Sequence, residues 1–99
     1  MIIIATTSWP PESSPEVGKR LLKLTPLPPF MTQKGPFLIS EIDTGIKGVC
    51  LYEFDQTKTA EAMVYVADRY AKYIGVPGLT YNVALCFEAK EAMKMIGMG

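Results

Sequence analysis

The position of its prolines constrains this chain most, because seven of the eight lie in the first 36 residues. Proline fixes φ and has no backbone N–H donor, so irregular connections are expected mainly in the first third. After Pro36 only Pro77 interrupts the pattern. With 99 residues, of which 48% are hydrophobic and 20% charged, the chain is predicted to fold as a single domain over residues 1–99.

Four segments have the pattern of β-strands. Residues 2–7 are rich in β-branched side chains and apolar on both faces, which is typical of an interior strand. Residues 37–42 and 46–54 are strand-like runs separated by the turn residues Asp43-Thr44-Gly45, and this spacing predicts a hairpin. Residues 79–87 alternate large apolar with smaller side chains, which predicts the fourth strand.

A first helix is predicted between the first two strands, where apolar residues recur at helical spacing as far as Leu24. Two starts fit the sequence. The helix begins near Pro10 with a distortion at Pro15, or it begins at Pro15 with Ser14 as its N-cap. We favour the early start.

Two further helices follow the hairpin. The longer one is capped by Asp55 or Thr57 and closed by Gly75 and Pro77. A short tail helix is predicted over residues 88–96, with its apolar residues turned inward. The apolar stripe of the longer helix is predicted to contain Ala60, Met63, Val64, Ala67, Ala71 and Ile74.

The element order is β-α-β-β-α-β with an added helix, which is the split-βαβ or ferredoxin-like pattern of α+β proteins. This pattern predicts two main helices on one face of a four-stranded antiparallel sheet of order 4-1-3-2. Cys50 and Cys86 then lie two strand spacings of ~4.8 Å apart, beyond the ~7 Å limit for a disulfide. Both are expected to be buried free thiols.

The sheet face away from the helices is expected to be apolar, because the third strand offers hydrophobic residues on both sides. Our assignment places Cys50, Tyr52 and Asn82 on this open face. A large exposed apolar patch marks an interface, so we expect a homodimer that packs sheet against sheet. The side chains assigned to the helix-covered face are Val49, Leu51, Tyr81, Val83 and Leu85.

In this order of elements the chain resembles the dimeric α+β barrel superfamily, in which two ferredoxin-like domains pack sheet to sheet, sometimes around a ligand pocket. Superfamily relatives include cofactor-independent quinone-forming monooxygenases, muconolactone isomerases and haem-degrading enzymes, but many of these use histidines that this chain lacks. Four stretches also resemble a family of small uncharacterised bacterial domains, which implies no function. They are Ser8-Trp9-Pro10-Pro11-Glu12, Val17-Gly18-Lys19-Arg20, Tyr52-Glu53-Phe54-Asp55 and Glu88-Ala89-Lys90-Glu91-Ala92.

Composition excludes several functions. Ten Lys and Arg balance ten Asp and Glu, which disfavours a nucleic-acid partner. The absence of histidine excludes Ser-His-Asp and Cys-His triads and zinc hydrolysis, and no metal or cofactor is expected. Residues 1–5 are too short for a membrane span and follow no basic segment, so a cytoplasmic protein without a membrane partner is predicted.

Five residues are candidates for a site. The resemblance places Trp9 at the mouth of a pocket, and the alternative is a hydrophobic plug over the helix entrance. Cys50, Tyr52 and Asn82 suit a small organic ligand on the open sheet face, although a plain dimer interface explains them as well. We therefore expect a homodimer that binds a small apolar or aromatic molecule. The alternative is a cofactor-independent monooxygenase- or isomerase-like enzyme that uses Tyr52, Asn82 and Glu53, the last as a general base.

Overall fold

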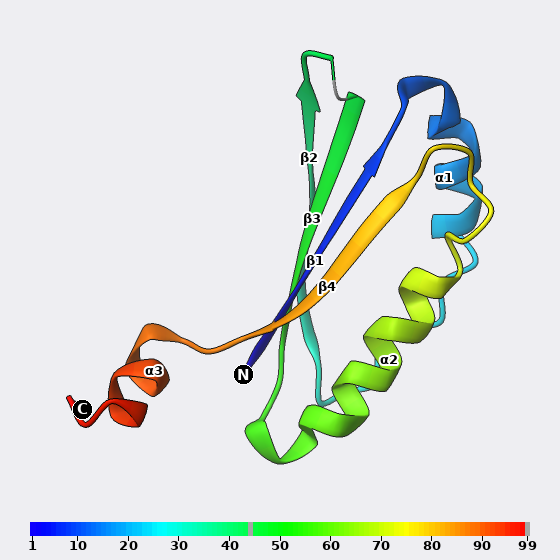
Figure 1. Ribbon diagram of the computed structural model, residues 1–99. Helices are drawn as coiled ribbons and strands as arrows, with labels where there is room; N and C mark the ends of the chain where they lie inside the picture. The colour runs from blue at the N-terminus through cyan, green and yellow to red at the C-terminus, as the bar shows by residue number, and fades with distance from the viewer. Residues whose placement is uncertain (44, 99) are drawn as a thin grey trace.

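A four-stranded antiparallel sheet and three α-helices form an α+β fold in the computed structural model, which describes residues 1–43 and 45–98 (Figure 1). The strands lie in the order β2-β3-β1-β4, which is the predicted order 4-1-3-2 read from the other edge. Thr44, in the predicted turn, lies outside the described residues. The elements are β1 (Ile2–Trp9), the 3-10 turn η1 (Pro11–Ser13), α1 (Ser14–Leu21), β2 (Thr32–Glu41), β3 (Gly45–Glu53), the 3-10 turn η2 (Gln56–Lys58), α2 (Thr59–Ala71), β4 (Thr80–Cys86) and α3 (Ala89–Met95).

β1 lies inside the sheet, as its apolar composition predicts. Ala5 of β1 is paired with Cys50 of β3 on one side and with Val83 of β4 on the other. Burial alternates along β1, and α1 and α2 both cover the face on which its buried side chains lie (Figure 1). The core therefore forms between this covered face and the two helices, while the other face is left open. The buried residues of β1 are Ile3, Ala5, Thr7 and Trp9.

β2 begins at Thr32, five residues earlier than the pattern predicts. Its pairing with β3 shifts between Lys34 and Phe37, where Gly35 has a φ of +98° and Pro36 has no N–H to donate. A Cβ at Gly35 would lie 2.7 Å from the carbonyl oxygen of Val49. A proline at an irregularity is tolerated because β2 is an edge strand, and a sequence rule that ends strands at proline misses this.

Both predicted starts of the first helix are partly correct. The chain turns helically at Pro11, but the α-helix itself begins at Ser14, with Ser13 as the N-cap. Pro15 then lies in the first turn, where its missing N–H removes no intrahelical hydrogen bond. The helix ends at Leu21, and Leu24 beyond it packs against the core without being helical.

α2 lies on the sheet through a stripe that differs from the predicted one. Val64 is 69% exposed and Ile74 67% exposed, so the predicted stripe is wrong. Tyrosine and arginine have apolar bodies that pack well, and a pattern that counts only aliphatic residues misses them. None of the described helices is long and apolar enough to cross a membrane. The buried residues of α2 and its C-terminal turn are Ala62, Val66, Arg69, Tyr70 and Tyr73.

Arg20 joins the two covering helices. Its Nη1 donates hydrogen bonds to the carbonyl oxygens of Lys72 and Ile74, each at 2.9 Å, just beyond the C-terminal end of α2. Its Nε also donates to Oε1 of Glu16 at 2.9 Å. A guanidinium at the end of a helix satisfies carbonyl groups that have no partner in the helix and interacts favourably with its dipole.

Replacing Arg20 by glutamine is expected to lower the free energy of unfolding by about 1–2 kcal/mol, since two charge-assisted hydrogen bonds between the helices are lost. Urea unfolding measures the change, and Lys19→Gln, which removes the same charge from the exposed face of α1, is the control. The hydrogen bond from Arg20 also lowers the pKa of Glu16. The Arg20–Glu16 interaction therefore stabilises the fold at neutral pH, and this stabilisation is lost as the pH falls through the lowered pKa of Glu16. The difference in the free energy of unfolding between wild type and Arg20→Gln should then shrink in acid.

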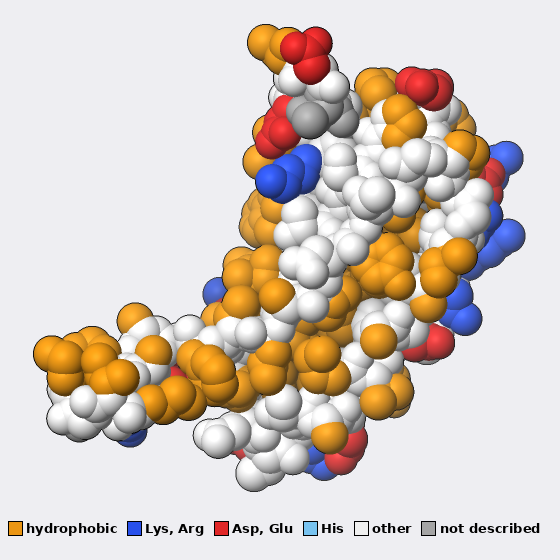
Figure 2. Space-filling view, viewed as in Figure 1, with side chains coloured by type: hydrophobic (Ala, Val, Ile, Leu, Met, Phe, Trp, Pro, Cys, Tyr) orange, Lys and Arg blue, Asp and Glu red, His pale blue; other side chains and the backbone are white. Residues whose placement is uncertain are grey.

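α3 projects from the body of the structure (Figure 1). Glu88 and Glu91 form a capping box at its start. The prediction that its apolar residues Ala89, Ala92, Met93 and Ile96 turn inward is wrong, because Met93 is 42% and Ile96 71% exposed. Figure 2 shows hydrophobic side chains gathered on this projecting end.

Candidate functional site

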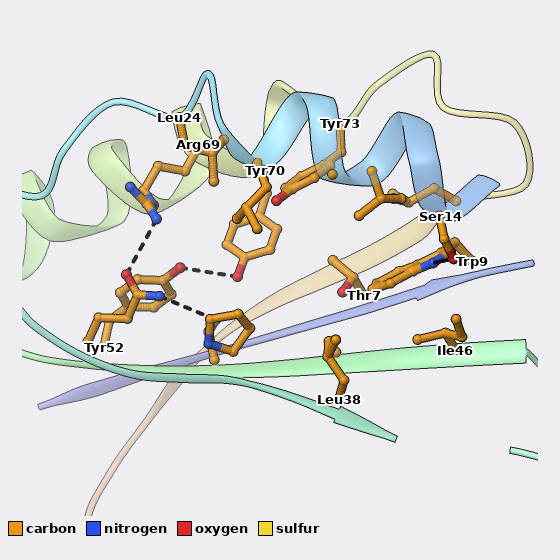
Figure 3. Close-up of a pocket in the computed structure, with 18 residues that line it drawn as sticks. Thr7, Trp9, Ser14, Leu24, Leu38, Ile46, Tyr52, Arg69, Tyr70 and Tyr73 are labelled. Carbon is orange, nitrogen blue, oxygen red and sulfur yellow. Dashed lines mark hydrogen bonds between the residues drawn. The ribbon is translucent and has the colours of Figure 1, made fainter. Parts of the chain in front are cut away.

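A cavity of about 360 Å³ lies between the covered face of the sheet and the helices α1 and α2 (Figure 3). Small-molecule sites have volumes from about 300 Å³ upward, whereas voids in a close-packed core rarely exceed one water molecule. Most of its wall is aromatic or aliphatic. The residues of the wall include Trp9, Leu38, Ile46, Tyr52, Tyr70 and Tyr73.

Glycines on facing elements line this cavity. Gly48 of β3 is opposite Thr7 of β1, and a Cβ at Gly48 would lie 2.8 Å from the Thr7 Oγ1 and 3.3 Å from Cδ2 of Leu38. Gly18 of α1 also lines the cavity, and a Cβ there would meet no atom within 4 Å. The helix therefore places no side chain at Gly18, whereas the space beside Gly48 is taken up by the neighbouring side chains of Thr7 and Leu38.

Trp9 forms one end of the cavity and is only 7% exposed. It is the last residue of β1, and its indole Nε1 donates a hydrogen bond to Oγ of Ser14 at 3.0 Å. This bond fixes the ring at the junction of β1 with α1. Trp9 thus covers the helix entrance and also lines the cavity. The two roles that the sequence analysis gave as alternatives, a hydrophobic plug and a pocket residue, are both present.

A cluster of tyrosines lines the middle of the cavity. The hydroxyl oxygens of Tyr52 and Tyr70 lie 3.1 Å apart, and the ring centroid of Tyr70 is 5.9 Å from that of Tyr73. Burial raises the pKa of Tyr52, Tyr70 and Tyr73 above the ordinary phenol value. These side chains therefore stay protonated at neutral pH and offer hydroxyl groups that donate or accept hydrogen bonds.

Arg69 of α2 is a buried cation at the other end, 8% exposed. Its Nη1 donates to the carbonyl oxygen of Thr25, and its Nη2 donates to Oε1 of Gln33 at 3.4 Å. Its Cζ lies 6.0 Å from the ring centroid of Tyr52. Its Nε is buried without a hydrogen-bond partner among the described residues.

Sequence reasoning missed Arg69, although a signal was present. Ala62, Val66, Arg69 and Tyr73 follow one another at i, i+4, i+7 and i+11, so they share one face of the helix. The predicted stripe followed the aliphatic side chains instead, so the face that contains this arginine was not considered. An arginine within an otherwise apolar stripe is the feature that would have identified it.

Three of the four residues predicted to bind a ligand lie together, although not on the predicted face. Trp9, Cys50 and Tyr52 line the cavity on the covered side of the sheet, so the assignment of Cys50 and Tyr52 to the open face is wrong. Asn82 is exposed and alternates along β4 with Tyr81, whose ring centroid is 5.9 Å from that of Tyr70 on the covered side. Asn82 is therefore on the open face, as predicted, and is separated from the other three.

Glu53 does not join the cavity either. Its Oε1 forms an ion pair with Nζ of Lys34 at 2.8 Å, and both side chains are substantially exposed. The residues Tyr52, Asn82 and Glu53, on which the enzyme hypothesis depends, therefore lie in three different surroundings.

The two cysteines are free thiols, as predicted. Cys50 is paired with Ala5 and Cys86 with Ile2, so β1 separates them. Cys50 is buried in the cavity wall, but Cys86 is only partly buried, which corrects the expectation that both are buried.

Comparison with protein-family models finds no match for this chain, and comparison with curated proteins finds none either. The function is therefore argued from the cavity and its residues.

Proposed function

We propose that this protein binds a small, largely apolar or aromatic molecule in the cavity between the sheet and the helices. The observation that carries the proposal is a cavity of about 360 Å³ in a domain of 99 residues. Trp9, Tyr70 and Tyr73 surround it with ring surfaces, and ring stacking favours an aromatic ligand. A few polar groups among apolar walls are the usual composition of a small-molecule site.

The chemistry of the wall favours binding over catalysis. The titratable side chains that line the cavity are Cys50, Arg69 and the three tyrosines, and no carboxylate is among the described lining residues. Since burial raises the pKa of each of these tyrosines, they are poor general bases at neutral pH. We therefore prefer a binding or sensor domain to an enzyme.

The second part of the proposal is a homodimer of the α+β barrel type, packed through the open sheet face. Phe37 and Ile39 on the edge strand β2 are 55% and 50% exposed, and Val49 pairs with Phe37 on β3. Ile4 and Leu51, partly buried, continue this surface across the sheet. A self-complementary apolar face of this kind suits a two-fold interface.

Native mass spectrometry of the purified protein tests both parts. A dimer is expected, carrying a small organic mass that is released on denaturation. A monomer would contradict the interface through the sheet. If no mass is retained and no member of a panel of aromatic compounds raises the melting temperature, the binding proposal is wrong, because any ligand of the native state must stabilise it.

A further inference from the structure

We propose that the ligand carries one anionic oxygen group, such as a carboxylate, which lies against Arg69. This inference rests on the proposed binding function and adds the chemical class of the ligand, a small aromatic monoanion.

The charge of Arg69 is the first step of the argument. Arg69 as a whole is 8% exposed, so its guanidinium has lost most of its hydration, and a buried charge is costly unless it is paired. The groups that face it are neutral: the carbonyl of Thr25, the amide of Gln33 and the phenol ring of Tyr52. The described residues form no ion pair with it, so this end of the cavity keeps a net positive charge.

The geometry of the donors is the second step. Nη1 is engaged by the carbonyl oxygen of Thr25 on one side of the guanidinium. Among the described residues, the opposite edge, formed by Nε and Nη2, makes only the 3.4 Å contact to Gln33, and Nε has no hydrogen-bond partner. This edge presents two parallel N–H groups, which is the arrangement that binds a carboxylate through both oxygens. An anion that displaces the Gln33 amide would satisfy both donors.

The polarity of the cavity is the third step. Arg69 and the Tyr52 hydroxyl lie at one end, and Trp9 lies at the other, with Tyr70 and Tyr73 between them (Figure 3). A molecule with its ring system among the aromatic side chains therefore places a single polar group at the Arg69 end. The protonated Tyr52 and Tyr70 can donate further hydrogen bonds to that group.

Two fluorescent probes of nearly the same shape test this. 8-Anilinonaphthalene-1-sulfonate is an anion, and N-phenyl-1-naphthylamine is its neutral counterpart. The wild type is expected to bind both, with energy transfer from Trp9, the only tryptophan, and to prefer the anion. Arg69→Gln should lower the affinity for the anionic probe by about tenfold or more and change the affinity for the neutral probe by less than about twofold.

Lys19→Gln is the matched control, because it removes the same charge from an exposed position of α1 outside the cavity wall. It should leave both affinities unchanged. Arg69→Lys, which retains the cation, should keep the preference for the anion and provides a test if Arg69→Gln fails to fold.

The outcomes separate the two proposals. The proposal of an anionic group would be wrong if the wild type bound the two probes equally well, or if Arg69→Gln lowered both affinities equally. The cavity would still be a binding site. If neither probe binds with energy transfer from Trp9, the proposed binding function itself is wrong.

Discussion

Replacing Gly18 by leucine is expected to abolish ligand binding and to stabilise the fold. Gly18 lines the cavity from α1 together with Ser14, Val17 and Leu21, and a Cβ there meets nothing within 4 Å. A leucine side chain therefore enters space that the ligand needs, and the affinity for N-phenyl-1-naphthylamine should fall by about a hundredfold or more, equivalent to about 2.7 kcal/mol. Replacing a helix glycine by leucine and burying its side chain should raise the free energy of unfolding by about 1–2 kcal/mol.

Two further substitutions control this prediction. Gly18→Ala supplies most of the gain in helix propensity but little volume, so it should stabilise by up to about 1 kcal/mol and leave binding nearly intact. Lys19→Leu adds the same bulk to the exposed face of α1 and should leave binding unchanged. Fluorescence titration and urea unfolding are measured on all three. A Gly18→Leu protein that binds the probe as the wild type does would show that the ligand lies elsewhere.

The sequence predicts the order of elements well. Strands and helices have different hydrophobic periodicities, and turn residues separate one element from the next. The strand order follows from the topology of that element order. The boundaries were less predictable. The start of β2 depends on Gly35 and Pro36, where the chain continues an edge strand through an irregularity that local rules interpret as a break.

The faces of β3 could not be assigned from its sequence. Val49 and Leu51 alternate with Cys50 and Tyr52, and both pairs are apolar enough for a core, so an assignment shifted by one residue fits the pattern equally well. The choice is made by tertiary contacts, since the hydroxyl of Tyr52 meets that of Tyr70 from α2. β4 was assigned correctly because its large and small residues fall on different faces.

The cavity could not be predicted from the sequence pattern either. It depends on the missing side chain at Gly18, which periodicity treats only as a weak position in a helix. The resemblance to barrel-forming dimers directed attention to the open face, whereas the cavity lies on the covered one. The same resemblance placed Trp9 at the mouth of a pocket, and Trp9 lines this cavity.

Replacing Tyr52 by alanine is expected to have the largest effect on stability. Tyr52 is 1% exposed and pairs with Ile3 in the centre of the sheet, and its ring meets that of Tyr70 edge to face at 6.4 Å. Truncation of a buried aromatic residue costs about 3–5 kcal/mol. Since a domain of this size has a free energy of unfolding of about 5–15 kcal/mol, the variant should lose a fifth of it or more.

Tyr52→Phe separates the ring from the hydroxyl. It keeps the packing but leaves the Tyr70 hydroxyl without its partner at 3.1 Å, so a loss of about 1–2 kcal/mol is expected. Tyr65 of α2 is 38% exposed, so Tyr65→Ala removes an aromatic ring outside the core and should cost about 1 kcal/mol or less. Urea unfolding followed by Trp9 fluorescence measures all three. Equal losses in Tyr52→Phe and Tyr52→Ala would mean that the hydroxyl pair, rather than the ring, holds α2 on the sheet, and the wall of the cavity would then depend on that single hydrogen bond.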